Sequence, residues 1–78
     1  MVRVEGTPRE IKGFSNGLQT VVVDIQVSTS SDLPTINEQI NGYPYVIAAG
    51  STAQIIQTGV FCTQDGNGTW YDANGNAI

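Results

Sequence analysis

The clearest hydrophobic pattern in the chain is a two-residue alternation from Leu18 to Val27. Four β-branched side chains recur at every second position of this segment: Val21, Val23, Ile25 and Val27. Polar residues occupy most of the positions between them, which predicts a β-strand with one buried face. Val22 is the exception, because it places an apolar side chain on the second face. We therefore expect that face to be partly covered, with another subunit as one candidate cover.

Shorter apolar segments, separated by turn signals, predict further strands. Val2 and Val4 alternate with charged residues until Gly6-Thr7-Pro8 interrupts the pattern, and residues 9–13 show no strong periodicity. Later strands are expected at residues 45–48, 53–57 and 60–64, with another beginning at residue 69. The sequence Asp65-Gly66-Asn67-Gly68 is typical of a hairpin connection. Together these features predict an antiparallel meander.

The intervening segment reads mainly as a loop. Thr35 followed by Glu38 matches a capping box, and Ile36 lies four residues before Ile40, so one helical turn is expected within residues 33–40. The resulting prediction is a single all-β domain with very little helix. It comprises an N-terminal arm and long strand (1–30), a connecting loop (31–44) and a small antiparallel β-meander (45–78).

Charge is sparse and unevenly distributed. The three basic residues, Arg3, Arg9 and Lys12, all lie within the first twelve positions, and the formal net charge is −4. Nucleic acids and anionic membranes are bound through basic groups, so the long stretch without any disfavours both as partners. No apolar run approaches the length of about 18 residues that marks a membrane-spanning helix. The N-terminus lacks the apolar core of a signal peptide, so we expect a cytoplasmic protein unless it leaves the cell inside a particle.

The size of the chain creates a need for partners. A domain of 78 residues has a marginal core and usually gains stability from disulfides, metals or oligomerisation. Cys62 is the only cysteine and there is no histidine, which rules out an internal disulfide and disfavours a zinc site. We therefore expect a homo-oligomer.

The groups that enzymes use for acid–base or nucleophilic chemistry are scattered. The nearest carboxylate pair is Asp65 and Asp72, which flank the Trp70–Tyr71 strand in a way that a glycosidase pair would allow. Both residues lie in turn-forming sequences, and this is the favoured interpretation. Cys62 has no basic neighbour in sequence to lower its pKa, so we interpret it as a buried structural thiol. We expect no catalytic residues and no enzymatic activity.

Calcium is the one metal that the sequence makes worth considering. Residues 65–69 and 72–76 each place oxygen-bearing side chains at alternate positions, as calcium loops do. Neither stretch has the closing bidentate acid at loop distance. We therefore interpret both as turns and expect neither a metal nor a cofactor.

The aromatic residues provide candidates for an interaction surface. Adjacent strand residues point to opposite faces, so only one of Trp70 and Tyr71 is expected in a small core. The other would be an interface anchor, part of a sugar-binding surface, or covered within the same subunit. The candidate interface residues are Val21, Val23, Ile25, Val27, Phe61, Trp70 and Tyr71.

A series of short motifs, in order, resembles the small head fibre or capsid-decoration proteins of tailed bacteriophages. The matching segments are residues 11–18 (IKGFSNGL), 31–34 (SDLP), 42–43 (GY), 50–53 (GSTA), 56–59 (IQTG) and 68–71 (GTWY). The resemblance implies a virion component without enzymatic activity or catalytic residues. Relatives of this kind are often longer, so this chain would be the bare attachment or decoration unit.

The expected partners follow from this resemblance. They are further copies of the chain, with a trimer as the expected form, and the major capsid protein or another virion protein. The arm Val2–Lys12 would lie along a neighbour, and the strand Leu18–Val27 would pair edge to edge with another chain. A tail or neck position in the virion, a carbohydrate- or host-surface-binding module that uses Trp70 and Tyr71, and a cytoplasmic accessory protein remain as alternatives.

Overall fold

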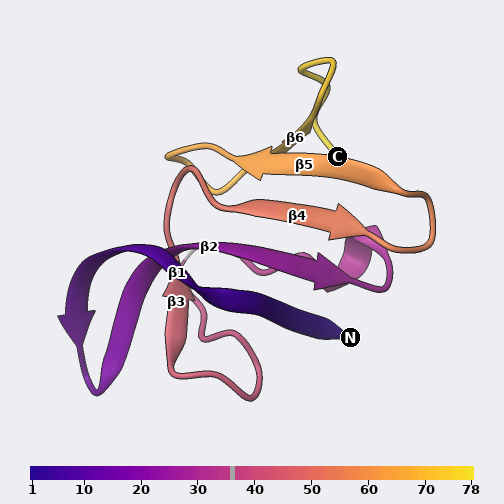
Figure 1. Ribbon diagram of the computed structural model, residues 1–78. Coiled ribbons are helices and arrows are strands. Elements are labelled where there is room, and N and C mark those ends of the chain that lie inside the picture. Colours follow the sequence, from indigo (N-terminus) through magenta and orange to yellow (C-terminus); the bar gives the residue numbers. More distant parts are fainter. Residues whose placement is uncertain (36) are drawn as a thin grey trace.

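The computed structural model describes residues 1–35 and 37–78 and is nearly all β, as predicted, with 53% of the chain in strands. One six-stranded sheet forms the molecule (Figure 1). Its elements are β1 (Val2–Ser15), β2 (Leu18–Val27), the short 3₁₀ helix η1 (Ser30–Asp32), β3 (Tyr45–Ile47), β4 (Thr52–Ile55), β5 (Val60–Gln64) and β6 (Trp70–Asp72). No helix in the described part of the chain is long and apolar enough to cross a membrane.

Strand β2 lies at the centre of the sheet, which has the order β1-β2-β4-β5-β6. It pairs antiparallel with β1 along one side and parallel with both β3 and β4 along the other. The prediction that β3 belongs to the antiparallel meander was therefore wrong. The connection 28–44 is long enough to return the chain to the start of β2, so β3 begins a parallel pairing. The antiparallel meander comprises β4, β5 and β6.

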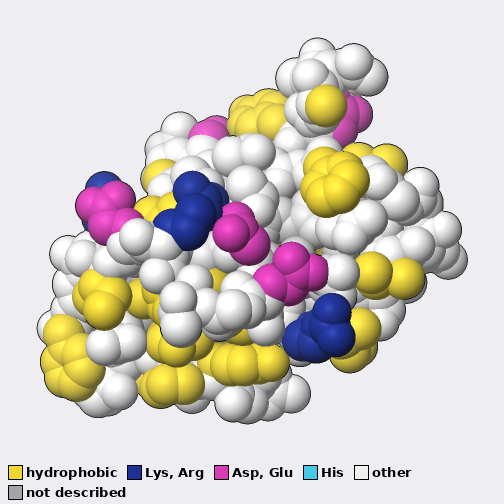
Figure 2. All heavy atoms as spheres, viewed as in Figure 1, with side chains coloured by type: hydrophobic (Ala, Val, Ile, Leu, Met, Phe, Trp, Pro, Cys, Tyr) yellow, Lys and Arg dark blue, Asp and Glu magenta, His cyan; other side chains and the backbone are white. Residues whose placement is uncertain are grey.

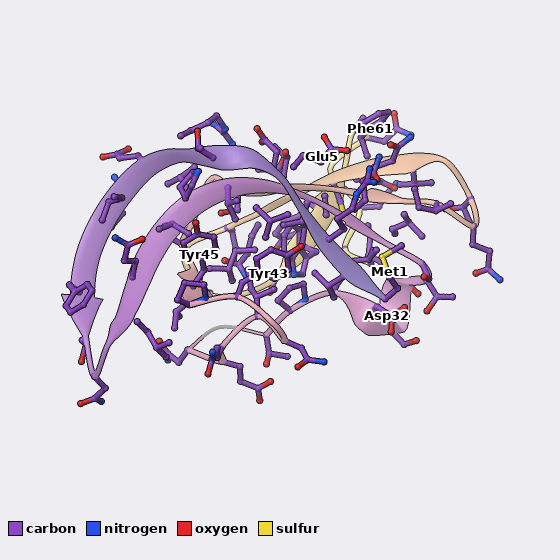
Figure 3. All side chains as sticks on the ribbon, turned by 60° about the horizontal axis from the view of Figure 1, so that its bottom comes forward. Met1, Glu5, Asp32, Tyr43, Tyr45 and Phe61 are labelled. Carbon is purple, nitrogen blue, oxygen red and sulfur yellow. The ribbon has the colours of Figure 1, made fainter. Side chains whose placement is uncertain are left out.

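Strand β1 continues through the segment where the sequence predicted an interruption. Glu5 pairs with Asp24 and Glu10 with Val22, so residues 6–9 of β1 lie opposite Val23 alone. This wide bulge accommodates Gly6 at a positive φ of 63° and a proline at position 8, which an edge strand tolerates. Beyond the bulge the β1–β2 hairpin bends into an arch (Figure 3). We call residues 9–22 of this hairpin the arm; this segment differs from the N-terminal arm Val2–Lys12 expected from the sequence.

The alternation in β2 produces the core, as predicted. Val21, Val23 and Val27 are 0% exposed, and Ile25 is 2% exposed. They pack with residues from each later strand and from the connection before β3: Ile40, Ile47, Ala53, Ile55, Cys62 and Trp70. Val22, on the opposite face, is only 6% exposed within the single chain, and the backbone of Gly50 approaches its side chain. No second subunit is needed to cover it.

A short helical turn that was not predicted precedes the predicted one. Helix η1 is preceded by Thr29, whose backbone N–H donates to Asp32 Oδ2 at 3.2 Å. At the predicted site, Glu38 N–H donates to the carbonyl of Thr35 at 3.4 Å, which makes an isolated turn. The predicted Ile36–Ile40 contact involves residue 36, which is outside the described residues, and Ile40 itself is buried in the core.

Ser51 joins the two parallel pairings of β2. Its hydroxyl accepts the N–H of Val23 at 3.1 Å and donates to the carbonyl of Ala48 at 2.7 Å. The side chain thus satisfies a buried amide at the point where the chain passes from β3 to β4. Ser51 is 0% exposed, so solvent water does not reach this hydroxyl in the folded chain.

We expect Ser51→Ala to destabilise the fold by about 1–3 kcal/mol, because the buried N–H of Val23 would lose its acceptor. The free energy of unfolding, measured by urea denaturation, tests this expectation. Ser31→Ala, at an exposed serine, is the matched control and should leave the unfolding midpoint almost unchanged. Equal midpoints for the two variants would contradict the role assigned to the Ser51 hydroxyl.

Candidate functional site

Five of the seven candidate interface residues lie in the core of the single chain. Val21, Val23, Ile25 and Val27 form its centre, and Trp70 is 6% exposed. Their side chains are therefore unavailable to a partner while the chain is folded. Strand alternation identified them as one apolar face, but it does not distinguish a face covered by the same chain from one covered by another.

Trp70 and Tyr71 point to opposite sides of β6, as predicted. The indole N–H of Trp70 donates to the carbonyl of Pro34 at 3.0 Å, which ties β6 to the connection 28–44. Tyr71 is half-buried and pairs with Thr63 on the outer face of the sheet. The carbohydrate-binding alternative that used both residues therefore retains only Tyr71.

Phe61 is the most exposed of the predicted interface residues, with 63% of its surface accessible. It lies on the outer face of β5, opposite Gln54 of β4 and two positions from Thr63. Thr63 in turn pairs with Tyr71, so both aromatic rings project from the same face of the sheet. This face offers two aromatic side chains beside uncharged amide and hydroxyl groups.

A polar network covers the rest of the outer face. Arg9 donates to Asp24 Oδ1 at 3.1 Å and to the carbonyl of Gly50 at 2.9 Å, and Thr52 donates to the same Asp24 oxygen at 2.6 Å. Charged side chains of both signs cross the middle of this view, with apolar side chains gathered at its lower left and upper right (Figure 2). The network holds the wide bulge of β1 against the sheet, so the N-terminal segment is part of the fold and not a free arm.

The arm carries two exposed apolar side chains that the sequence analysis did not select. Phe14 is 71% exposed and Ile11 is 58% exposed. Tyr43 and Tyr45 lie beneath the arch of the hairpin (Figure 3), with their rings stacked at a centroid distance of 6.2 Å. A second bulge between Ile11 and Gly13 breaks the two-residue period, which is why the alternation pattern missed these residues.

Both carboxylates of the proposed glycosidase pair stabilise turns. Asp65 Oδ1 accepts the N–H groups of Asn67 at 2.8 Å and Thr69 at 2.9 Å. Asp72 Oδ1 accepts those of Asn74 and Asn76, each at 2.9 Å. The two loops repeat one Asp-x-Asn-Gly-x turn at an interval of seven residues, and the interpretation of both stretches as turns is confirmed.

The remaining reactive groups have structural surroundings. Burial raises the pKa of the Cys62 thiol, whose Sγ lies 3.5 Å from the carbonyl oxygen of Ala53. The N-terminal ammonium group, 3.0 Å from Asp32, and the backbone N–H of Thr29 hold the pKa of the Asp32 carboxyl below its usual value. Within residues 1–35 and 37–78, no three acidic or cysteine side chains are placed to share a metal ion.

Two open pockets accompany these features. One, of about 250 Å³, lies beside the β4–β5 hairpin and is lined by Ile55, Val60, Ile78 and the polar residues Ser30, Gln57, Thr58 and Asp72. The other, of about 290 Å³, lies along the connection 28–44 next to Val2 and contains Asp32 and Glu38. The carboxylate of Asp32 in the second pocket is paired with the N-terminal ammonium group.

The edges of the sheet correct the predicted mode of attachment. Both sides of β2 are occupied, by β1 and by β3 and β4, so this strand does not pair edge to edge with another chain. At the far end, the bridge between Tyr71 and Ala77 covers part of β6. The long exposed edge belongs to β1.

Comparisons with protein-family models, curated proteins and solved structures find no match to this chain.

Proposed function

We propose that the chain is a non-enzymatic structural protein of a tailed-bacteriophage virion, attached as a homo-oligomer to the outside of the head through the major capsid protein. The observation that carries this proposal is the pair of separate exposed apolar regions on such a small fold. One region is the arm, with Ile11 and Phe14, and the other is Phe61 with the half-buried Tyr71 on the outer face. Exposed aromatic and aliphatic side chains of this kind are typical interface anchors.

Two further considerations support this reading. A structural protein that joins like copies and also binds a shell needs two different surfaces, and the arm and the outer face are different surfaces. The ordered motifs from residue 11 to residue 71 resemble head fibre and decoration proteins. A tail or neck position would use the same two surfaces.

The test is the amount of the chain in purified particles. We expect it at high copy number in virions of the encoding phage after density-gradient purification and washing, as measured by quantitative mass spectrometry. Phe61→Ser should reduce its retention on the particles, whereas Thr63→Ser, on the same face, should not. Absence of the chain from washed particles would contradict the proposal.

A host-glycan-binding role is the second candidate, because Phe61 and Tyr71 share the outer face with Gln54 and Thr63. Aromatic rings supply an apolar platform, and neighbouring amides and hydroxyls supply hydrogen bonds. A glycan-array screen of the purified chain, with Phe61→Ala as the comparison, distinguishes this role from attachment to the shell. Binding that is lost in Phe61→Ala would favour the glycan role.

A further inference from the structure

The core-facing side of the sheet continues onto the arm without a cover. Ile11 pairs with Val21, which in turn pairs with Ile47 of β3. Directly opposite residues share a face of the sheet, so the three side chains form one row. Val21 and Ile47 are almost fully buried, whereas Ile11 at the end of the row is 58% exposed. The row therefore ends at an open edge.

That edge is the outer side of β1, which pairs only with β2 among the described strands. An unpaired strand edge presents N–H and C=O groups that can form a ladder with another strand. Pro8 lacks an N–H and lies within the wide bulge, just before the arm. It therefore limits any such ladder to the residues of β1 that follow it. The available segment is residues 9–13, centred on Ile11; it begins at the last residue of the wide bulge and includes the second bulge, in which Lys12 is the extra residue relative to β2.

The charges around Ile11 are self-complementary. Glu10 and Lys12 flank it, and Lys12 Nζ lies 3.1 Å from Glu10 Oε2, so both side chains are on the same side of the arm. If a second copy pairs antiparallel about Ile11, Glu10 of each chain lies opposite Lys12 of the other. A two-fold interface requires a surface that complements itself, and this segment satisfies that requirement.

The charges also select the register. Moving the centre of symmetry to Glu10 places the two Glu10 side chains opposite each other, and moving it to Lys12 does the same with the two lysines. Like charges directly opposite destabilise a strand pair. With the centre at Ile11, Arg9 lies opposite Gly13, and the two Ile11 side chains meet on the core-facing side.

We propose that two copies of the chain associate through their arms, by antiparallel pairing of β1 about Ile11, to form one continuous sheet. A second copy is the favoured partner for the open edge of β1, because Glu10 and Lys12 of one chain complement Lys12 and Glu10 of the other. This proposal deepens the homo-oligomer of the proposed function and rests on it for the expectation that the chain assembles. It replaces the trimer expected from the sequence by a two-fold dimer.

Charge exchange tests the proposal. Sedimentation equilibrium of the full chain should show a monomer–dimer equilibrium. Glu10→Lys and Lys12→Glu should each increase the dimer dissociation constant by at least about tenfold, which corresponds to about 1.4 kcal/mol. The double variant Glu10→Lys/Lys12→Glu should restore dimerisation, because each new lysine again lies opposite a glutamate. The matched control is Glu38→Lys, a remote change of the same charge that should dimerise like the wild-type chain.

Folding does not confound this comparison. Both side chains are about half exposed, at 50% and 57%, and such ion pairs contribute little to stability. Thermal melting monitored by circular dichroism should be similar for all four variants. As a second probe, Ile11→Ser should abolish the dimer while the monomer remains folded.

Three results would overturn the arm dimer: a wild-type monomer throughout the micromolar range, single variants that dimerise normally, or a double variant that remains dissociated. The proposed virion role fails separately. A dimer that follows the charge-exchange pattern but is absent from washed particles would retain the interface and contradict the attachment role.

Discussion

Replacing Trp70 with alanine is expected to destabilise the chain by about 3–5 kcal/mol, the usual cost of removing a buried large aromatic side chain. The total stability of a 78-residue domain is of the order of 4–12 kcal/mol. The substitution therefore removes a large share of it. The indole is 6% exposed, packs in the core and holds β6 to Pro34 through its N–H. Urea denaturation followed by circular dichroism measures the loss without relying on tryptophan fluorescence.

Two comparison variants separate the contributions to this loss. Tyr71→Ala changes the adjacent, half-buried residue on the outer face and should cost clearly less. Trp70→Phe retains much of the apolar volume but removes the N–H, so it should fall between the other two variants. A midpoint for Trp70→Ala that equals that of the wild-type chain would contradict the core position of Trp70. Loss of glycan binding in this variant would report unfolding, and Phe61→Ala is the better test of binding.

Replacing Gln64 with leucine is expected to have the opposite effect and to stabilise the fold by about 1–3 kcal/mol, the desolvation penalty of an unpaired buried polar group. Gln64 is 2% exposed, and neither polar atom of its amide side chain has a hydrogen-bond partner in the described structure. Its backbone carbonyl and N–H remain bonded to Gly50 and Ser51 whatever the side chain. Leucine is one bond shorter but similarly bulky and has no polar atoms, so it retains most of the packing and removes the penalty.

Gln54→Leu provides the matched control for this substitution. Gln54 lies on the outer face, where its Oε1 accepts a hydrogen bond from Gln26 at 3.4 Å. The same change at this position should shift the free energy of unfolding by no more than about 0.5 kcal/mol in either direction. A lower unfolding midpoint for Gln64→Leu than for the wild-type chain would show that the buried amide contributes favourably and would contradict the expectation.

Local sequence patterns correctly predicted the elements that are specified by residues close together in the sequence. The bounds of β2 follow from two-residue alternation between the Asn16-Gly17 turn and the polar residues that begin at Ser28, and those of β5 follow from the turns at Gly59 and Gly66. The Asp65 turn follows from the ability of an aspartate side chain to accept backbone N–H groups two and four residues later. In each of these cases the determining contacts lie within a few residues of one another.

Features that depend on distant residues were not predicted. The sequence of β3 does not encode that its partner is β2, or that the pairing is parallel. The sequence did not show that β1 is continuous, because residues 6–9 of the wide bulge break the alternation. The residues on either side of the bulge still pair with β2. Helix η1 was not predicted, because its capping box has Asp32 at the position where the sequence signal usually has Glu or Gln.

The same distinction applies to the candidate surfaces. Alternation correctly placed Val21, Val23, Ile25 and Val27 on one apolar face. Their exposure depends on which later residues pack against that face. Ile11 and Phe14 remained unselected because they lie beside a bulge, where the two-residue period fails. Phe61, expected as an aromatic anchor, lies on the exposed outer face.

The central position of β2 between an early and a late partner has a consequence for the order of folding. The β1–β2 hairpin joins residues that adjoin one turn, and isolated hairpins form in about 1–10 μs. The contact between Asp24 and Thr52 spans 28 positions, and such non-local pairing forms more slowly. During synthesis, the hairpin would emerge before β4, β5 and β6, with its valine face open to solvent. That face stays incompletely covered until these later strands leave the ribosome, and early capture by chaperones or sister chains would act in this interval.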